Sequence, residues 1–170
     1  AVTFGIVYGI SDFGLARQLG ISRKEAARYI ELYFMRYPGV HTYLKGCVER
    51  AKQQGAATTL FGRRREMPEL KSSNYNTRSF GERVAMNMPI QGTAADIIKL
   101  AMVRVHNELK ARGMKSELIL QIHDELIIDA VQEEADVAAE ILKSCMENVV
   151  NLKVPLLAEV HTGHSWFDTK

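Results

Sequence analysis

The sequence has few of the features that mark secreted or membrane proteins. Its two cysteines, Cys47 and Cys145, lie far apart and match no metal-ligand spacing, which favours a reducing compartment over a disulfide framework. No apolar run approaches the roughly 20 residues that a membrane-spanning helix needs. No basic segment followed by an apolar one opens the chain as a signal peptide would. We therefore expect a cytoplasmic protein that does not enter a membrane.

The chain also has little net charge. Its 170 residues carry a formal charge of +2, and they are 46% hydrophobic and 25% charged, which is a globular and not a disordered composition. The distribution of charge is more informative than its sum. The basic cluster is Arg63, Arg64, Arg65, Arg78 and Arg83, and the acidic one is Glu133, Glu134 and Asp136. The chain begins inside an apolar segment without a Met, so we expect a piece of a longer protein.

The first two-thirds of the sequence predict helices. Glycines that end helices, and capping residues or prolines that begin them, divide this part into segments. Ser22 and Glu25 form a capping box, and Pro38 suits a first helical turn. The expected helices are 1–10, 12–19, one from Ser22, 38–54 and 76–112, with a small hairpin of 58–61 and 64–67 turned at Gly62. Pro89 removes the hydrogen bond to the carbonyl of Ala85, so we expect a kink or break there.

In the last third of the sequence the residue pattern changes and predicts strands. Segments 118–122 and 126–131 are rich in strand-forming residues, and only His123-Asp124-Glu125 separates them. That spacing requires a tight antiparallel hairpin, here 117–131. A helix over 133–150 and a third strand, Leu156–Val160, complete an α+β fold. The apolar stripe that faces the core of the preceding helix is Ala94, Ile97, Ile98, Ala101, Val105 and Leu109.

The hairpin tip, Gln121-Ile122-His123-Asp124-Glu125-Leu126, is the strongest chemical signal. Acidic residues in a turn are often only solvated. Here the apolar strands on both sides fix the tip, as a metal ligand requires. Mg²⁺ is typically held by one or two carboxylates and substrate phosphates. Asp124 is the better ligand candidate, because neighbouring strand residues point to opposite faces and Glu125 would not chelate the same ion.

Two further patterns suggest a binding surface. Phe4 and Tyr8 share one helix face, with Gly5 and Gly9 at the same spacing. Such a pair is often core, but a helical glycine marks close approach by another group, and a nucleobase sliding over aromatic rings would explain both. The second pattern is a stripe of Arg83, Asn87 and Gln91. It is either a solvated helix face or a set of donors for phosphate, sugar and base edges.

Together these motifs resemble family A DNA polymerases of the bacterial DNA polymerase I type, over essentially the whole chain. Three co-linear motifs are more specific than any one. Thr3-Phe4-Gly5-Ile6-Val7-Tyr8-Gly9-Ile10-Ser11 is similar to the end of the fingers helix, and the 121–126 segment to the palm hairpin. Segments 37–40, 62–64 and 89–96 also match. The resemblance divides the chain into fingers-derived helices, 1–55, and a palm portion, 56–170.

The resemblance implies a nucleotidyltransferase of DNA replication or DNA repair that uses Mg²⁺. Asp124 would hold the metal with Glu125 in support, and Phe4 and Tyr8 would face the incoming deoxynucleoside triphosphate. The residues at primer-template DNA would be Gly9, Arg83, Asn87, Gln91 and His123. The primer 3′-hydroxyl would attack the nucleotide α-phosphorus by a two-metal mechanism.

The same resemblance implies segments that these 170 residues do not contain. They are the first palm motif with a second metal-binding Asp, and the fingers Arg and Lys that grip the triphosphate. Two other interpretations follow from the residues: a DNA-binding module without chemistry, and an unrelated metal-dependent hydrolase. The hydrolase would use His123, Asp124 and His161 or His164, but it leaves Phe4, Tyr8 and the polar stripe unexplained.

Overall fold

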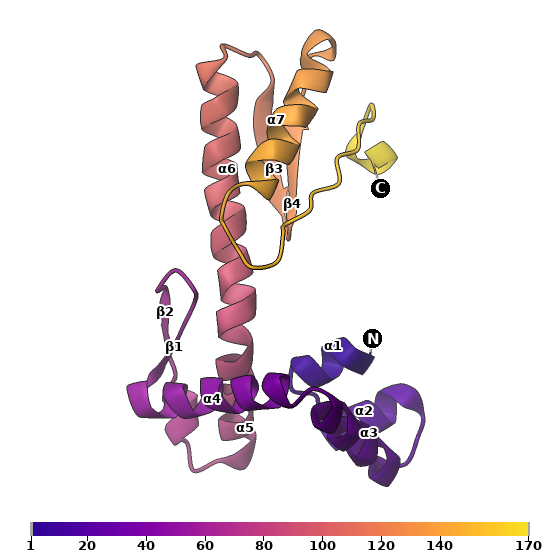
Figure 1. The fold of residues 1–170 in the computed structure, drawn as a ribbon, viewed down its shortest axis with the longest axis vertical. Helices are drawn as coiled ribbons and strands as arrows, with labels where there is room; N and C mark the ends of the chain where they lie inside the picture. Colours follow the sequence, from indigo (N-terminus) through magenta and orange to yellow (C-terminus); the bar gives the residue numbers. More distant parts are fainter. Residues whose placement is uncertain (1, 170) are drawn as a thin grey trace. The chain divides into compact units, whose positions relative to one another are not determined.

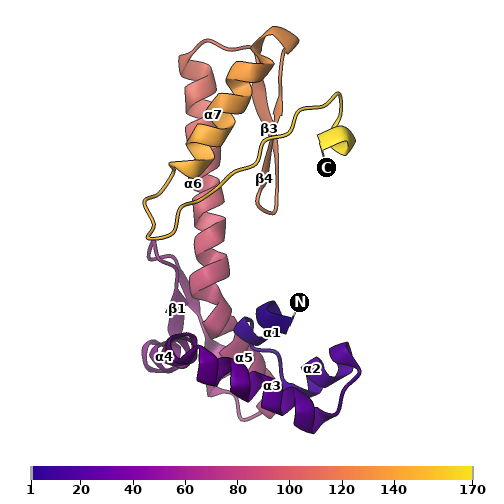
Figure 2. The same ribbon diagram turned by 45° about the vertical axis from the view of Figure 1, so that its right-hand side comes forward.

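The structure, a computed structural model, describes residues 2–169 as helices joined to two small antiparallel hairpins (Figures 1 and 2). The chain divides between Thr93 and Ala94 into two compact units, which we call unit 1 and unit 2. The expected α+β class is confirmed. None of the helices within residues 2–169 is both long and apolar enough to cross a membrane. The functional division at residue 55 differs from this structural one and stays a prediction.

Unit 1 begins with four helices whose ends follow the sequence signals closely. They are α1 (Val2–Val7), α2 (Asp12–Leu19), α3 (Arg23–Arg36) and α4 (Pro38–Gln54). The capping box forms as expected: Ser22 Oγ accepts the N–H of Glu25, and the Glu25 carboxylate accepts the N–H of Ser22. Gly20 and Gly55 end α2 and α4 with positive φ. Local sequence therefore determines these boundaries.

A short hairpin, 3₁₀-helix η1 (Pro68–Lys71) and helix α5 (Tyr75–Asn87) complete most of unit 1. The hairpin pairs β1 (Ala56–Thr58) with β2 (Arg64–Glu66), so its first strand lies nearer to α4 than the predicted 58–61. Residues 59–63 form the turn instead, because the Thr59 N–H donates to the Arg63 carbonyl and Thr59 accepts the N–H groups of Gly62 and Arg63. The core beneath is one apolar cluster of Val48, Ala51, Ala57, Met67, Leu70 and Ala85.

Pro89 neither breaks nor simply kinks the helical path. Residues Met88–Gly92 form a single π-helical turn, η2, before α6 (Thr93–Ala111) begins. A π-turn is a usual way to accommodate a proline that cannot donate a hydrogen bond. On α6, residues Ile98, Ala101, Val105 and Leu109 are buried as predicted. Ala94, also assigned to that stripe, is exposed.

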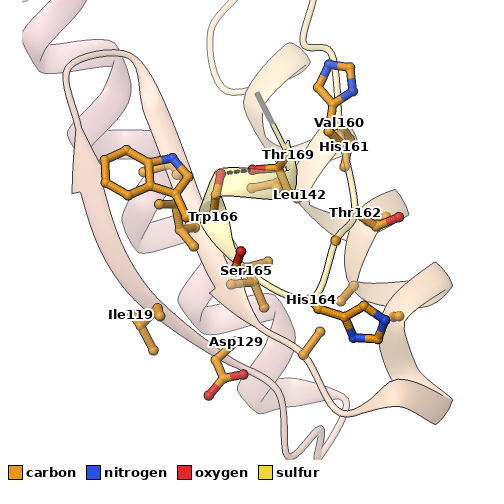
Figure 3. Close-up of a pocket in the computed structure, with 18 of the residues that line it drawn as sticks. Ile119, Asp129, Leu142, Val160, His161, Thr162, His164, Ser165, Trp166 and Thr169 are labelled. Atoms are coloured by element: carbon orange, nitrogen blue, oxygen red, sulfur yellow. Dashed lines mark hydrogen bonds between the residues drawn. The ribbon is translucent and has the colours of Figure 1, made fainter.

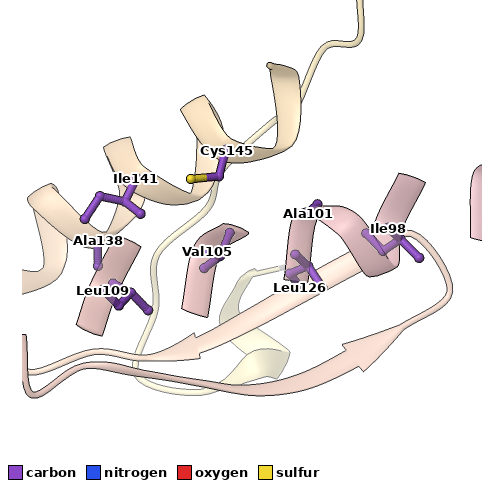
Figure 4. Packing of buried hydrophobic residues seen from close by; sticks show 8 residues of the cluster. All are labelled: Ile98, Ala101, Val105, Leu109, Leu126, Ala138, Ile141 and Cys145. Atoms are coloured by element: carbon purple, nitrogen blue, oxygen red, sulfur yellow. The ribbon is translucent and has the colours of Figure 1, made fainter. Parts of the chain in front are cut away.

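Unit 2 packs α6, the hairpin of β3 (Glu117–Ile122) and β4 (Glu125–Asp129), and α7 (Ala135–Glu147) around one core (Figure 4). Leu126 is the strand residue that is buried in this cluster. Glu134, in the 3₁₀-helix η3 (Gln132–Glu134) before α7, joins the two hairpin ends through Ser116. Burying these side chains stabilises the unit by roughly 25 cal/mol per Å² of apolar surface.

The expected third strand, Leu156–Val160, does not form. The segment pairs with neither β3 nor β4 among the described residues, and Leu157 is 84% exposed. One of its amides, that of Ala158, donates to the Glu147 carboxylate at 3.1 Å. Each strand of the two-stranded β3–β4 sheet has an unpaired outer edge, but no described backbone hydrogen bond joins the segment to it, so a strand sequence alone does not ensure pairing. The expected 133–150 helix is likewise shorter, Ala135–Glu147.

Candidate nucleic-acid interface and hairpin tip

The aromatic pair of α1 is a surface feature, not core. Phe4 is 68% exposed, and its ring lies 6.2 Å from that of Tyr8 with a 23° angle between their planes. Ile6, on the opposite face of the helix, is the residue that α1 buries. The two rings therefore form a flat apolar platform that one face of a planar ligand would match.

Gly9 ends α1 and brings it against α5. Its φ is +78°, and the amides of Gly9 and Ile10 donate to the carbonyls of Ile6 and Gly5, the pattern of a Schellman motif. A Cβ at this position would lie 2.6 Å from Met86 Cε and 3.2 Å from Arg83 Cγ. The close approach that the sequence predicted thus comes from α5, and it sets the aromatic platform beside Arg83.

The polar stripe continues along α5 and η2. Arg83 is half-buried and donates to Ser79 Oγ at 3.1 Å, while Gln91 is exposed. Asn87 Oδ1 is buried and lacks a hydrogen-bond partner among the described residues. A buried amide oxygen without a partner is costly, so Asn87 is suited to a donor supplied by a ligand. A purely solvated face would not bury that oxygen.

Much of the arginine cluster is already engaged. Arg64 pairs with Glu66 at 2.8 Å, and this pairing lowers the pKa of the Glu66 carboxyl. Arg65 lies 3.9 Å from the Glu69 carboxylate. Arg78 donates to the carbonyls of Ser72 and Ser73. The cluster as a whole is therefore less available to phosphates than its charge suggests.

In unit 2 the 117–131 hairpin forms as predicted, with a two-residue turn. Ile122 pairs with Glu125, so His123 and Asp124 are the central residues and Glu125 begins β4. His123 has a φ of +52°, and Asp124 does not share this left-handed conformation, which matches the φ signs of a type II′ turn. Gln121 Nε2 donates to the His123 carbonyl at 2.6 Å.

The hairpin turn presents its polar side chains to solvent. His123, Asp124 and Glu125 are all exposed, and Leu126 is buried immediately behind them. A carboxylate in this position fits one ligand of a hard cation such as Mg²⁺. Within residues 2–169, however, no three His, Cys, Asp or Glu side chains gather to hold a metal ion. Asp124 fits such an ion in donor type, as a single carboxylate ligand.

The histidines near the C-terminus do not join Asp124. His161 and His164 line a cavity of about 710 Å³ between β4, α7 and residues 160–169 (Figure 3). Their imidazole rings lie apart from each other in this view, and neither His123 nor Asp124 lines the cavity. His161 instead lies 4.0 Å from Glu159. The geometry therefore gives the hydrolase interpretation no metal site.

Comparison with known proteins accounts for the whole set of motifs. The family model for DNA polymerase family A matches residues 1–168. Over all 170 residues the chain is 56% identical to DNA polymerase I of Caldicellulosiruptor bescii, 53% to that of Bacillus caldotenax and 51% to that of Lactococcus lactis. It spans about a fifth of the length of these relatives, 20% of the first and 19% of the other two.

A solved structure gives the same result for the fold. The chain is similar to the POL domain of Pol1 from M. smegmatis, determined in complex with DNA primer-template and dNTP. The TM-score is 0.94 at 44% identity, and the match covers 98% of this chain and 30% of that one. The resemblance drawn from the motifs is confirmed, and this chain belongs to DNA polymerase family A.

Proposed function

We propose that this chain is the fingers and palm part of a DNA-directed DNA polymerase. In the complete protein it serves template-directed addition of deoxynucleotides to a primer. The primer 3′-hydroxyl oxygen forms a bond to the nucleotide α-phosphorus and the bond to the β-phosphate oxygen breaks. Pyrophosphate leaves, and the hydroxyl proton passes to solvent. A cytoplasmic location is part of the same proposal.

The contact between Gly9 and Arg83 carries this proposal. It sets the exposed Phe4–Tyr8 platform and the Arg83–Asn87–Gln91 stripe together within unit 1. Stacking surfaces beside guanidinium and amide donors suit a nucleotide base next to a nucleic-acid backbone. We assign Phe4 and Tyr8 to the incoming nucleotide. Gly9, Arg83, Asn87, Gln91 and His123 are assigned to primer-template DNA.

Asp124 is assigned to the chemistry. Its carboxylate would hold Mg²⁺ with carboxylates from outside these residues, and Glu125 would support the site from the start of β4. When bound, the metal supplies charge neutralisation at the reacting phosphate. The chain's own contribution is to hold Asp124 in a fixed turn, anchored by Leu126 in the core and by the Gln121 hydrogen bond.

A DNA-binding module without chemistry is the second candidate, and it is less favoured. It accounts for the platform and the stripe. It gives no reason for a carboxylate held in a tight turn that places a non-glycine residue, His123, at positive φ, which costs about 1–2 kcal/mol.

The decisive experiment replaces Asp124 in the complete polymerase chain that contains these residues. Asp124→Ala should lower the rate of nucleotide addition by at least about 10²–10³, the effect of removing one group that stabilises transition-state charge. Primer-template affinity should stay largely unchanged, because many other contacts hold the DNA. Single-turnover extension and equilibrium DNA binding measure the two quantities separately.

Glu133→Ala is a matched control, because this exposed carboxylate lies away from the hairpin tip in η3. It should leave both quantities unchanged, and Glu125→Ala should have a smaller effect than Asp124→Ala. If Asp124→Ala polymerises as well as the control, the assignment of Asp124 to the chemistry is wrong. If the unsubstituted complete polymerase chain binds DNA and does not extend a primer, the binding-module interpretation is correct.

A further inference from the structure

Thr93, at the end of the π-turn, makes two hydrogen bonds that connect separate elements of unit 1. Its hydroxyl donates to the carbonyl of Pro89, four residues earlier in the same turn. It also accepts the N–H of Leu60, in the turn of the β1–β2 hairpin, at 2.9 Å. Thr93 is only 8% exposed. One buried hydroxyl therefore fastens the π-turn to the hairpin.

The surrounding packing leaves little freedom for the π-turn. A Cβ at Gly92 would lie 2.7 Å from Thr59 Cγ2 and 3.0 Å from Met88 Sδ, so the backbone of the turn lies directly against the hairpin. The hairpin turn is itself held by two hydrogen bonds between Thr59 and Arg63, of 2.9 and 3.1 Å. The π-turn thus packs against a hairpin turn whose conformation is held by its own hydrogen bonds.

The π-turn separates two of the residues assigned to DNA. Asn87 precedes it, with a buried Oδ1 that has no hydrogen-bond partner within residues 2–169, and Gln91 lies within it. A π-turn changes the angular spacing of side chains on the two sides of it relative to an α-helix. The conformation of Met88–Gly92 therefore sets the direction of the Gln91 amide relative to the Asn87 amide.

We infer that Thr93 is a positioning residue for DNA: its hydroxyl holds the π-turn in the register that presents the Asn87 and Gln91 amides together. This inference rests on the proposed function of those two residues. Without the hydroxyl, the Pro89 carbonyl loses the side-chain donor of Thr93, and the Leu60 amide loses its acceptor. The turn can then relax toward regular α-helical spacing and misdirect Gln91.

The test compares Thr93→Val and Thr93→Ser in the complete polymerase chain. Valine keeps the shape and removes both hydrogen bonds, and serine keeps the hydroxyl. We expect Thr93→Val to lower the extension rate of a correctly paired primer about tenfold with the nucleotide KM unchanged. Thr93→Ser should restore the rate to within about twofold of the unsubstituted chain.

Thr42→Val is the matched control, because the exposed Thr42 hydroxyl also donates to a proline carbonyl four residues earlier, that of Pro38 at 3.0 Å. No second element is fastened there by a described hydrogen bond. The Thr42→Val variant should leave primer extension unchanged. If Thr42→Val lowers extension, losing any such hydrogen bond perturbs the protein generally, and the inference is overturned.

A double-mutant cycle with Gln91→Ala separates positioning from stability. If Thr93 acts through Gln91, the loss caused by Thr93→Val should be much smaller in the Gln91→Ala background. Full additivity of the two losses would overturn the inference, because a general loss of stability does not depend on Gln91. If Gln91→Ala alone leaves extension unchanged, the proposed DNA assignment of Gln91 fails instead.

Discussion

The two candidate regions of this chain differ in how much of their surroundings they contain. In unit 1 close packing sets Gly9 against Arg83, and the Thr93 hydrogen bonds join the π-turn to the β1–β2 hairpin. In unit 2 the Asp124 carboxylate is exposed at a turn, and no group of three or more metal-ligating side chains forms among the described residues. A surface that positions a ligand is built within this segment, whereas a centre for chemistry needs groups converging from elsewhere.

This difference matters for interpreting a chain that spans about a fifth of the length of its relatives. Binding surfaces built on local helix packing keep their geometry, because each side chain is held by neighbours close in sequence or in the same unit. A metal site draws its ligands from several elements and is only partly defined by any one of them. The following predictions perturb each region in turn.

Apart from the loss expected for Asp124→Ala, the largest expected effect is at the platform. Phe4→Tyr in the complete chain adds a hydroxyl to an exposed ring, and a hydroxyl facing the nucleotide sugar can replace a missing 3′-hydroxyl. One hydrogen bond of about 1–3 kcal/mol would raise the incorporation ratio of dideoxy to deoxy nucleotides about 5–150-fold. Competitive single-nucleotide incorporation measures this ratio. An unchanged ratio would show that Phe4 does not face the sugar.

Gly9→Ala should disturb the same surface through the backbone. Alanine at a φ of +78° costs about 1–2 kcal/mol, and its Cβ also meets Arg83 and Met86. We expect a lower thermal unfolding midpoint together with weaker DNA binding. Gly20→Ala is the control, because Gly20 has a φ of +66° and nothing within 4 Å of its Cβ position. If both variants bind DNA equally well, the α1–α5 contact does not shape the surface.

The smallest expected effect is a pH dependence of the stability of unit 2, caused by Glu134 at the ends of the hairpin. Hydrogen bonds from the Ser116 hydroxyl and from the amides of Lys115 and Ser116 lower the pKa of Glu134. A lowered folded-state pKa gives stability that is complete above the unfolded pKa, about 4.3, and is lost as pH falls through the folded value. Glu134→Gln should therefore flatten the acid side of the stability profile.

Thermal unfolding midpoints measured from neutral to acidic pH test this expectation. Glu133→Gln removes a neighbouring exposed carboxylate for which no hydrogen bond is described, and it should keep the profile of the unsubstituted protein. Equal profiles for the two variants would show that Glu134 does not stabilise the folded state through its charge.

Local signals predicted the helices and the motif hairpin because their causes are short-range. The Ser22–Glu25 capping box, the Gly20 and Gly55 helix ends and the 117–131 hairpin all depend on residues within a few positions of one another. These features could be predicted from sequence with little ambiguity. The exposure of Phe4 could not, because an aromatic pair at this spacing fits a core as well as a binding surface, and only the structure shows that Ile6 is the residue that α1 buries.

The features that escaped prediction depend on distant partners. The Leu156–Val160 segment has a strand sequence, but pairing depends on how it meets the distant β3–β4 hairpin, and no described strand pairs with it. Thr93 was not predicted, because its importance comes from Leu60, thirty-three residues away. The local signal that could have revealed it is a threonine four residues after a helical proline, Pro89. The pairing of Arg64 and Arg65 with nearby carboxylates likewise became visible only in the structure.

The central claim is that these residues carry polymerase surfaces but not a complete reaction centre. Primer extension by the purified, monodisperse 170-residue chain with Mg²⁺ tests it most directly. The account predicts weak primer-template binding, falling steeply as salt rises, and no template-dependent extension. Extension by the chain that is lost in Asp124→Ala would contradict the account, because it would show that the converging groups are already present within these residues.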